Sequence, residues 1–257
     1  MTTGLPPGFH AITGPFGYTG GHITRALLAA GLPVVGLTSR PRPDGMQAVT
    51  VRPYDWDAPE RLTATLQGAA VLYNTYWVRF DRGRTTFELA LERIQALLRA
   101  AKTAGVGRIV HLSVTNASPD SALPYFRGKG IAEDMVRQSG IPYSIVRPAL
   151  VFGDGDILIN NIAWFLRRSP LFGLPDGRNY RVQPIAAEDL AALVMEHGGR
   201  TGIAETDAVG PDAFTFSEIV RLIRDAVGGS PLIVPVPGVL ARAVTWLAGC
   251  LTGDVVL

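Results

Sequence analysis

One stretch, Thr13 to Gly20 (Thr-Gly-Pro-Phe-Gly-Tyr-Thr-Gly), constrains the fold of this chain more than any other. An apolar run from Phe9 precedes it, and apolar residues at helical spacing follow it. A glycine-rich turn from a strand into a helix presents backbone N–H groups and the positive end of the helix dipole, which together suit a pyrophosphate. Gly14 permits a sharp turn, Gly17 lets the backbone lie against phosphates, and Gly20 allows close packing of helix and sheet. The motif predicts a dinucleotide-binding turn.

The residues around this motif separate it from a flexible surface loop, which is the alternative for any glycine triplet. Ile23, Leu27 and Leu28 lie on one face of a predicted helix. Residues 31–33 (Gly-Leu-Pro) end that helix, and a second apolar strand, 34–37, follows directly. This strand–turn–helix–strand unit spans about 30 residues, as the fingerprint requires. We expect the loop to contact the cofactor through Gly14, Phe16, Gly17, Tyr18, Thr19 and Gly20.

The composition fits a compact protein that binds neither nucleic acid nor the interior of a membrane. Hydrophobic residues make up 47% of the 257, and the mean hydropathy is +0.20, so the chain can bury a large core. A net charge of +2 offers no broad footprint for nucleic acid. No apolar run reaches the roughly 18 residues needed to cross a bilayer, and the apolar segment 239–251 is interrupted by Arg242.

The cysteine and histidine content narrows the chemistry further. A single cysteine, Cys250, rules out an internal disulfide and fits a reducing compartment. Residues 1–8 lack the features of a secretory signal, so we expect a cytoplasmic protein. No metal site is predicted, because the four histidines lie far apart without cysteine partners: His10, His22, His111 and His197.

Strand and helix patterns alternate through the first two thirds of the chain, which is typical of a Rossmann-type, doubly wound parallel sheet in an α/β fold. We predict a dinucleotide-binding domain at 1–150 and a small substrate-binding lobe at 151–257 that is intertwined with it. The apolar last residues, 254–257, leave open that the natural chain continues further. Strands are expected at 9–13, 34–37, 48–51, 70–74, 108–114 and 143–147, and helices at 59–66, 85–104, 123–138, 160–168, 188–196 and 216–228.

Tyr125 and Lys129 stand four residues apart in the first turns of a predicted helix, which places them on one face. A phenol has an unperturbed pKa of about 10, and a nearby ammonium favours the phenolate. The lysine can also hold a ribose hydroxyl. The alternative is that Tyr125 and Lys129 are a surface pair on an ordinary helix. The position of the pair after the fifth strand of a dinucleotide fold favours acid–base chemistry.

The end of the second strand, Thr38-Ser39-Arg40, bears on the choice of cofactor. A site for NAD favours a carboxylate there for the ribose 2′-hydroxyl, whereas a site for NADP favours a cation for the 2′-phosphate. Arg40 supplies the cation, and no carboxylate occurs until Asp44. We predict a preference for NADPH, with NAD as the alternative cofactor. The alternative without a binding role is that Arg40 is an ordinary solvated side chain.

Together, the three glycines, Tyr125/Lys129 and the segment 147–153 (Arg-Pro-Ala-Leu-Val-Phe-Gly) resemble the extended short-chain dehydrogenase/reductase superfamily over nearly the whole chain. Segments 73–77, 111–116 and 181–184 resemble most its atypical branch, which includes the NADPH-binding accessory subunit of respiratory complex I and bacterial NAD-dependent epimerase/dehydratase-like proteins. The resemblance implies that five further residues border the cofactor: Asn74 and Thr75, Pro148 near the nicotinamide, and Asp55 and Trp56 near the adenine. Asp55 and Trp56 are equally compatible with loop packing.

The resemblance also implies a hydroxyl partner for Tyr125 at the end of the fifth strand. Ser113 and Thr115 both qualify because alternation puts them on the same face, and we favour Ser113. The family's asparagine in the preceding helix is replaced, with Ala90 or Ala96 near its position, and only about ten residues separate the hydroxyls from Tyr125.

Two functions follow from these features. The first is an NADP-dependent oxidoreductase or nucleotide-sugar epimerase/dehydratase-like enzyme, in which Tyr125, Lys129 and Ser113 act on a small-molecule substrate, either a carbonyl compound or a sugar nucleotide. The second is a catalytically weak NADPH-binding scaffold or redox sensor, favoured by the replaced asparagine and the short connection. The sequence leaves a homo-oligomer open and does not identify the substrate.

Overall fold

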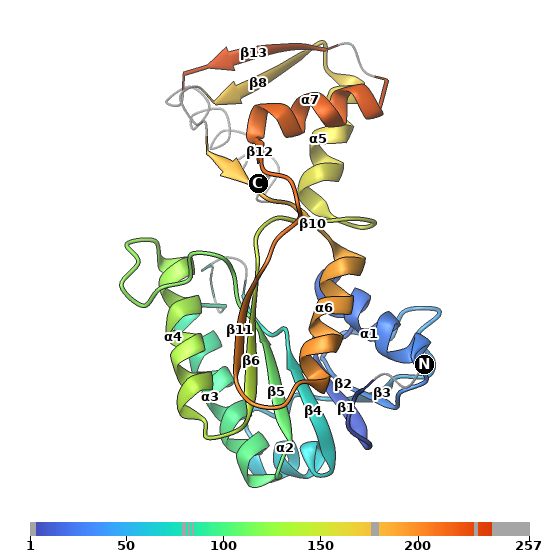
Figure 1. Cartoon of the computed structure of the whole chain (residues 1–257), viewed down its shortest axis with the longest axis vertical. Coiled ribbons are helices and arrows are strands. Elements are labelled where there is room, and N and C mark those ends of the chain that lie inside the picture. The colour runs from blue at the N-terminus through green and yellow to red at the C-terminus, as the bar shows by residue number, and fades with distance from the viewer. Residues whose placement is uncertain are drawn as a thin grey trace. The chain divides into compact units, whose positions relative to one another are not determined.

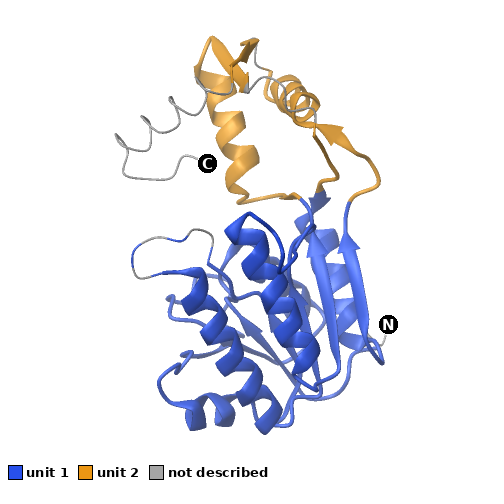
Figure 2. Ribbon diagram, turned by 90° about the vertical axis from the view of Figure 1, so that its left-hand side faces the viewer, with its two compact units in different colours: residues 1–149, 185–209 blue, residues 150–184, 210–257 orange. Residues whose placement is uncertain are grey.

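The computed structural model describes residues 4–78, 81, 83, 85–175, 180–228 and 231–237. The apolar segment 239–251, Cys250 and the last residues 254–257 lie outside these ranges. The chain divides into two compact units, Met1–Ala149 with Ile185–Val209 and Leu150–Pro184 with Gly210–Leu257. Figure 2 shows the two units in different colours.

Unit 1 is built on a seven-stranded sheet in the order β11-β6-β5-β4-β1-β2-β3, with every neighbouring pair parallel (Figure 1). This confirms the predicted Rossmann-type parallel sheet. Because β1 has β2 on one side and β4 on the other, the crevice for a ligand lies at the carboxyl end of β1. The strands are β1 (Phe9–Thr13), β2 (Val34–Leu37), β3 (Thr50–Arg52), β4 (Ala69–Asn74), β5 (Arg108–Leu112), β6 (Tyr143–Pro148) and β11 (Ala204–Ala208).

Helices cover both faces of this sheet. On one face, α1 (Tyr18–Ala29) packs against α6 (Ala187–Gly199), which follows the short strand β10 (Ile185–Ala186). On the other, α3 (Phe87–Thr103) packs between α2 (Pro59–Leu66) and α4 (Pro124–Gln138). Proline stands in the first turn of α2 and α4, where its missing N–H costs nothing, and the Thr86 side chain caps α3. The buried apolar residues of β4, β5, α3 and α4 form one core.

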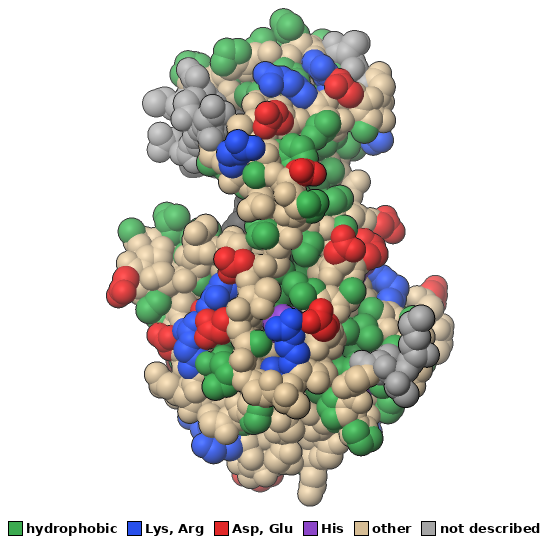
Figure 3. All heavy atoms as spheres, viewed as in Figure 1, with side chains coloured by type: hydrophobic (Ala, Val, Ile, Leu, Met, Phe, Trp, Pro, Cys, Tyr) green, Lys and Arg blue, Asp and Glu red, His purple; other side chains and the backbone are tan. Residues whose placement is uncertain are grey.

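The strand β11 is a feature that sequence patterns did not predict. Its residues, Ala-Glu-Thr-Asp-Ala, carry few large apolar side chains because it lies at the sheet edge and pairs only with β6. Residues 185–209, expected in the second lobe, pack in unit 1. On β11, Glu205 forms ion pairs with Arg147 on β6 and Arg137 on α4. Acidic and basic side chains accordingly lie side by side over β6, β11 and α4 in Figure 3.

Unit 2 has a small core of its own, formed by Ile162, Leu166 and Val220. The first two come from α5 (Ile157–Arg168) and the third from α7 (Phe216–Ala226). Asp156 caps α5, and Thr215 with Glu218 forms a capping box on α7. The strands are β7 (Val151–Phe152), the parallel pair β8 (Leu171–Pro175) and β13 (Leu232–Val236), and the antiparallel pair β9 (Arg181–Val182) and β12 (Phe214–Thr215).

Within the described ranges, no helix combines the length and the apolar character needed to span a bilayer. The same residues contain no group of three histidine, cysteine or acidic side chains placed to hold a metal ion.

Candidate active site

The glycine turn between β1 and α1 is shaped by its backbone. Gly14 has φ +63°, in the left-handed region that favours glycine, and its N–H donates to Leu37 O at 2.9 Å. A Cβ on Gly20 would lie only 2.1 Å from Gly14 O, so helix and turn approach too closely for a side chain. Gly17 caps α1 without any side-chain acceptor. The first N–H groups of α1 are therefore available to an anion.

Thr13 joins this turn to the carboxyl end of β4. Its hydroxyl oxygen lies 3.0 Å from Asn74 Oδ1 and accepts from the N–H groups of Thr75 (2.8 Å) and Tyr76 (3.0 Å). The Thr75 hydroxyl returns a hydrogen bond to Thr13 O. Asn74 and Thr75 are thus placed beside the glycine turn, with Thr75 Oγ1 also 3.2 Å from the position of a Cβ on Gly20.

The same hydrogen bonds continue to His111 on β5. Asn74 Nδ2 and His111 Nδ1 are 3.0 Å apart, and since the amide nitrogen donates, Nδ1 accepts and the proton of the neutral ring is on Nε2. His111 is fully buried. Burial, reinforced by the charges of Lys129, Arg137 and Arg147, lowers its pKa to about 3. The imidazole is therefore neutral across the physiological range.

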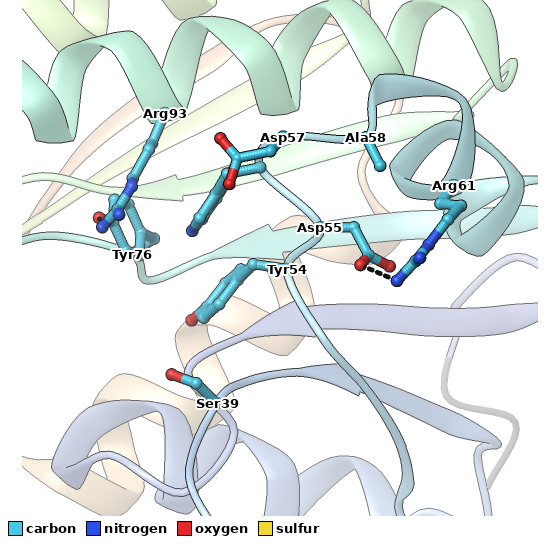
Figure 4. A pocket seen from close by; sticks show the side chains of 9 residues that line it. Ser39, Tyr54, Asp55, Asp57, Ala58, Arg61, Tyr76 and Arg93 are labelled. Atoms are coloured by element: carbon cyan, nitrogen blue, oxygen red, sulfur yellow. Dashed lines mark hydrogen bonds and ion pairs between the residues drawn. The ribbon is translucent and has the colours of Figure 1, made fainter.

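An open pocket of about 560 Å³ lies beyond the ends of β2, β3 and β4 (Figure 4). Tyr54 and Trp56 stack with ring centroids 4.6 Å apart and planes 11° apart, and Tyr76 packs against both. Arg93 donates to the Tyr76 hydroxyl at 3.0 Å and lies 5.6 Å from the Trp56 ring centroid. A flat, partly apolar wall of this kind suits a planar base. The pocket is lined by Ser39, Tyr54, Asp55, Trp56, Asp57, Ala58, Arg61, Tyr76 and Arg93.

Tyr54 connects this pocket to the glycine turn. Its hydroxyl oxygen lies 3.9 Å from the position of a Cβ on Gly14, and burial raises its pKa to about 12. Figure 4 shows its hydroxyl end directed to the Ser39 side, whereas Asp55 points the other way and pairs with Arg61. The Asp55 carboxylate is therefore already neutralised by a neighbour.

Arg40 follows β2 at the rim of this region. Its backbone N–H donates to the Thr38 hydroxyl at 3.0 Å, which fixes the turn, while its side chain is exposed. The guanidinium lies near enough to Tyr54 to act on the charge of that phenol. An exposed cation here can form a charge-assisted hydrogen bond with an anionic group.

Tyr125 and Lys129 lie on α4, the helix that follows the carboxyl end of β5. Lys129 is 4% exposed, and its Nζ donates to Leu112 O at 2.9 Å. Burial lowers its pKa to about 7, opposed by the nearby carboxylate of Glu133. Tyr125 packs edge-on against Trp77 and Phe87. The site thus combines a phenol with an amine that titrates near neutrality.

The two hydroxyl candidates after β5 differ in their surroundings. Ser113 is buried near the Glu133 carboxylate, and its Oγ has no hydrogen-bond partner. Burial raises the pKa of Glu133, but hydrogen bonds from Arg147 and Arg137 bring it below its usual range. Thr115 is partly exposed, and its N–H donates to Pro148 O at 3.1 Å. Of the two, Thr115 is the more accessible to a substrate.

Every residue proposed from the sequence for cofactor or chemistry lies in unit 1, in or just after β1, β2, β3, β4, β5 and β6 or in the helices that follow β1 and β5. Because all these strands are parallel, their carboxyl ends lie at the same end of the sheet. Sequence reasoning missed the roles of Tyr54, Arg93, Trp77 and His111. For Tyr54 and Trp77, the signal in the sequence is an aromatic residue shortly after a strand.

Comparison with known proteins identifies the class to which this fold and site belong. Residues 14–160 match a family model described as NAD(P)H-binding. The chain is 30% identical over 245 residues to a ceramide reductase of Caulobacter vibrioides, an alignment covering 91% of this chain and 75% of the reductase. It is 25% identical over 246 residues to the alpha subcomplex subunit 9 of mitochondrial NADH dehydrogenase [ubiquinone] 1 from Arabidopsis thaliana, covering 90% of this chain. The chain spans 61% of the length of that plant subunit.

The fold has close parallels among solved structures. MoeE5, solved in complex with UDP-glucuronic acid and NAD, superposes with a TM-score of 0.77 at 21% identity over 90% of this chain and 86% of that one. The chain belongs to this NAD(P)H-binding family, as expected of an extended short-chain dehydrogenase/reductase. The predicted family and fold class are confirmed.

Proposed function

We propose that this protein is an NADPH-dependent reductase that acts on a small carbonyl compound. The proposal rests on three features that lie at the carboxyl-terminal end of the same sheet. They are a glycine turn suited to an anion, an aromatic pocket and the Tyr125/Lys129 pair. A binding module needs only the first two. The buried amine and the phenol, which both pack against Trp77, are the feature that chemistry requires.

The residues present fit a dinucleotide. The turn from Gly14 to Gly20 offers N–H groups and no side chains where a pyrophosphate needs space, and the pocket at Tyr54, Trp56 and Tyr76 suits adenine. Arg40 would meet a 2′-phosphate, Asn74, Thr75 and Pro148 would border the cofactor, and Lys129 would hold the second ribose. When bound, the reduced nicotinamide supplies a hydride.

Within this arrangement Tyr125 delivers the proton that a reduced carbonyl oxygen must receive. The Lys129 ammonium favours the phenolate left on Tyr125, because opposite charges at short range stabilise each other. The hydroxyl that polarises the carbonyl is either Ser113 or Thr115; the sequence pattern favours Ser113, and exposure favours Thr115. A single cysteine in the sequence fits a reducing compartment such as the cytoplasm.

A second candidate is an NADPH-binding scaffold of low activity. The burial of Ser113 favours it, because that hydroxyl is then withdrawn from a substrate. The similarity to a complex I subunit points the same way. An epimerase or dehydratase acting on a sugar nucleotide remains the alternative substrate class within the enzyme hypothesis.

Titration with NADPH and NADH, followed by a substrate screen, tests these proposals. We expect NADPH to bind, and carbonyl compounds to oxidise it steadily; UDP-sugars are included to detect the epimerase alternative. Lys129→Ala should weaken NADPH binding and abolish turnover together. Tight NADPH binding with no turnover on any compound would favour the scaffold, and no binding of either dinucleotide would reject both.

A further inference from the structure

Trp77 contacts both residues to which we assign chemistry. It lies three residues beyond the end of β4, and the Lys129 Nζ is 4.9 Å from its ring centroid. The indole meets Tyr125 edge-on, with centroids 6.3 Å apart and planes 84° apart. It also stacks on Phe87 at 5.8 Å, which fixes its plane.

The helix carrying the pair is adapted to this indole. A Cβ on Gly128 would lie 2.9 Å from Trp77 Cη2 and 3.0 Å from Cζ2, so any larger residue would collide with the ring. Glycine is a poor residue for a helix interior. Its presence directly before Lys129 makes room for the indole, and it links the placement of Trp77 to the helix turn that carries the amine.

The indole face addresses the main difficulty of the Lys129 site, which is burial of a charge. Burial disfavours an ammonium, and the groups that face Lys129 include the neutral His111 on β5 and the Glu133 carboxylate on its own helix. An aromatic face attracts a cation, more strongly when water is excluded. Leu112 O accepts one of the three ammonium protons, and the indole covers another direction.

We propose that Trp77 is a positioning residue that acts through Lys129, holding its amine in the charged form and in place on the helix face shared with Tyr125. This inference rests on the proposed function for its consequence in catalysis. Its physical core, the effect of the indole on Lys129, is measurable without substrate or cofactor.

The pKa of Lys129 can be measured individually because the chain contains only two lysines, Lys129 and the exposed Lys102. With 13C-labelled lysine, NMR titration of the two ε-carbons gives both pKa values in one sample, and Lys102 is the internal reference. Trp77→Leu should lower the Lys129 pKa by about one pH unit, as expected for a desolvated cation–π contact, and leave that of Lys102 unchanged. Trp77→Phe keeps a smaller aromatic face and should give a smaller shift.

Trp164→Leu is the matched control, because Trp164 also lies against a cation, Arg168 at 4.6 Å, but in unit 2. It should leave both lysine pKa values unchanged. Circular dichroism establishes folding, and if Trp77→Leu does not fold, Trp77→Phe carries the test. An unchanged Lys129 pKa in the folded variant, or an equal shift in Trp164→Leu, would overturn the proposal.

Failure of the proposed function gives a different result, namely no dinucleotide binding by the parent protein, whatever the NMR titration shows. If turnover is found, the pH–rate profile of the Trp77 variants should move in parallel with the measured Lys129 pKa. A purely structural role for Trp77 would instead lower kcat by the same factor at every pH and leave the profile in place.

Discussion

The two ends of the candidate site differ in how they treat charge. At the glycine turn, the groups available to a ligand are backbone N–H groups, and Arg40, which follows β2 nearby, is exposed. At α4, the cation Lys129 is buried, and this desolvation lowers its pKa to about 7, while the Trp77 indole lies over the ammonium. An exposed cation keeps its full charge for a phosphate, whereas a buried amine is desolvated, so its charge depends on the groups that cover it.

The largest expected effect concerns the glycine turn. Gly17→Val should abolish binding of either dinucleotide, because a β-branched side chain takes the space of the pyrophosphate. The fold should survive, since a Cβ on Gly17 would lie 3.4 Å from Gly14 O and its φ is −78°. Calorimetry and thermal unfolding measure the two effects. Unchanged affinity in a folded Gly17→Val protein would place the phosphates elsewhere.

Gly20→Ala serves as the contrasting variant at this end. Its Cβ would lie 2.1 Å from Gly14 O, so the turn must move, and we expect a loss of folding stability of about 1–3 kcal/mol together with weaker binding. Only this variant, and not Gly17→Ala, should show the stability loss in a urea titration.

The next effect concerns the α4 end. Tyr125→Phe keeps the ring and its contacts with Trp77 and removes only the hydroxyl. Once a substrate is known, kcat should fall on the order of a hundredfold or more, while NADPH affinity stays within about a factor of three. Undiminished turnover would exclude Tyr125 as the proton donor.

His111, which links the two ends through Asn74, predicts a loss of stability in acid. Its pKa is about 3 in the folded protein and about 6.5 when unfolded, so the unfolded state alone binds this proton between those values. Stability is therefore complete above about pH 6.5 and is lost as the pH falls. From pH 6.5 to 4.5 this group should remove about 2–3 kcal/mol. His111→Gln should show a smaller loss by urea unfolding, and an identical loss would contradict the burial argument.

The smallest effect concerns cofactor choice at Arg40. We expect NADPH to bind about tenfold more tightly than NADH, equivalent to about 1.4 kcal/mol, because a charge-assisted contact to the 2′-phosphate is lost with NADH. Arg40→Ala should erase most of this difference in a fluorescence titration. Equal affinities in the parent protein would refute the preference.

Local patterns were enough to predict the parallel sheet, most of its helices and the glycine turn. Alternation of strands and helices follows from nearest-neighbour spacing, and the Gly14 turn depends on residues adjacent in the chain. The strand β11 escaped prediction because an edge strand with Glu205 and Asp207 lacks the apolar signal of a buried one. The pairing of Asp55 with Arg61 was likewise not evident from their types alone.

The sequence by itself determined the fold class and the place where a dinucleotide is expected, since both depend on short-range spacing, and its motifs carried the resemblance to the family. Only the tertiary structure decided that Lys129 lies under Trp77, that Ser113 lies against Glu133 and that His111 is joined to Thr13 through Asn74. These contacts join residues from different strands and helices. Desolvation and hydrogen bonding act through space, so the protonation of a buried group is set by neighbours that are distant in the chain.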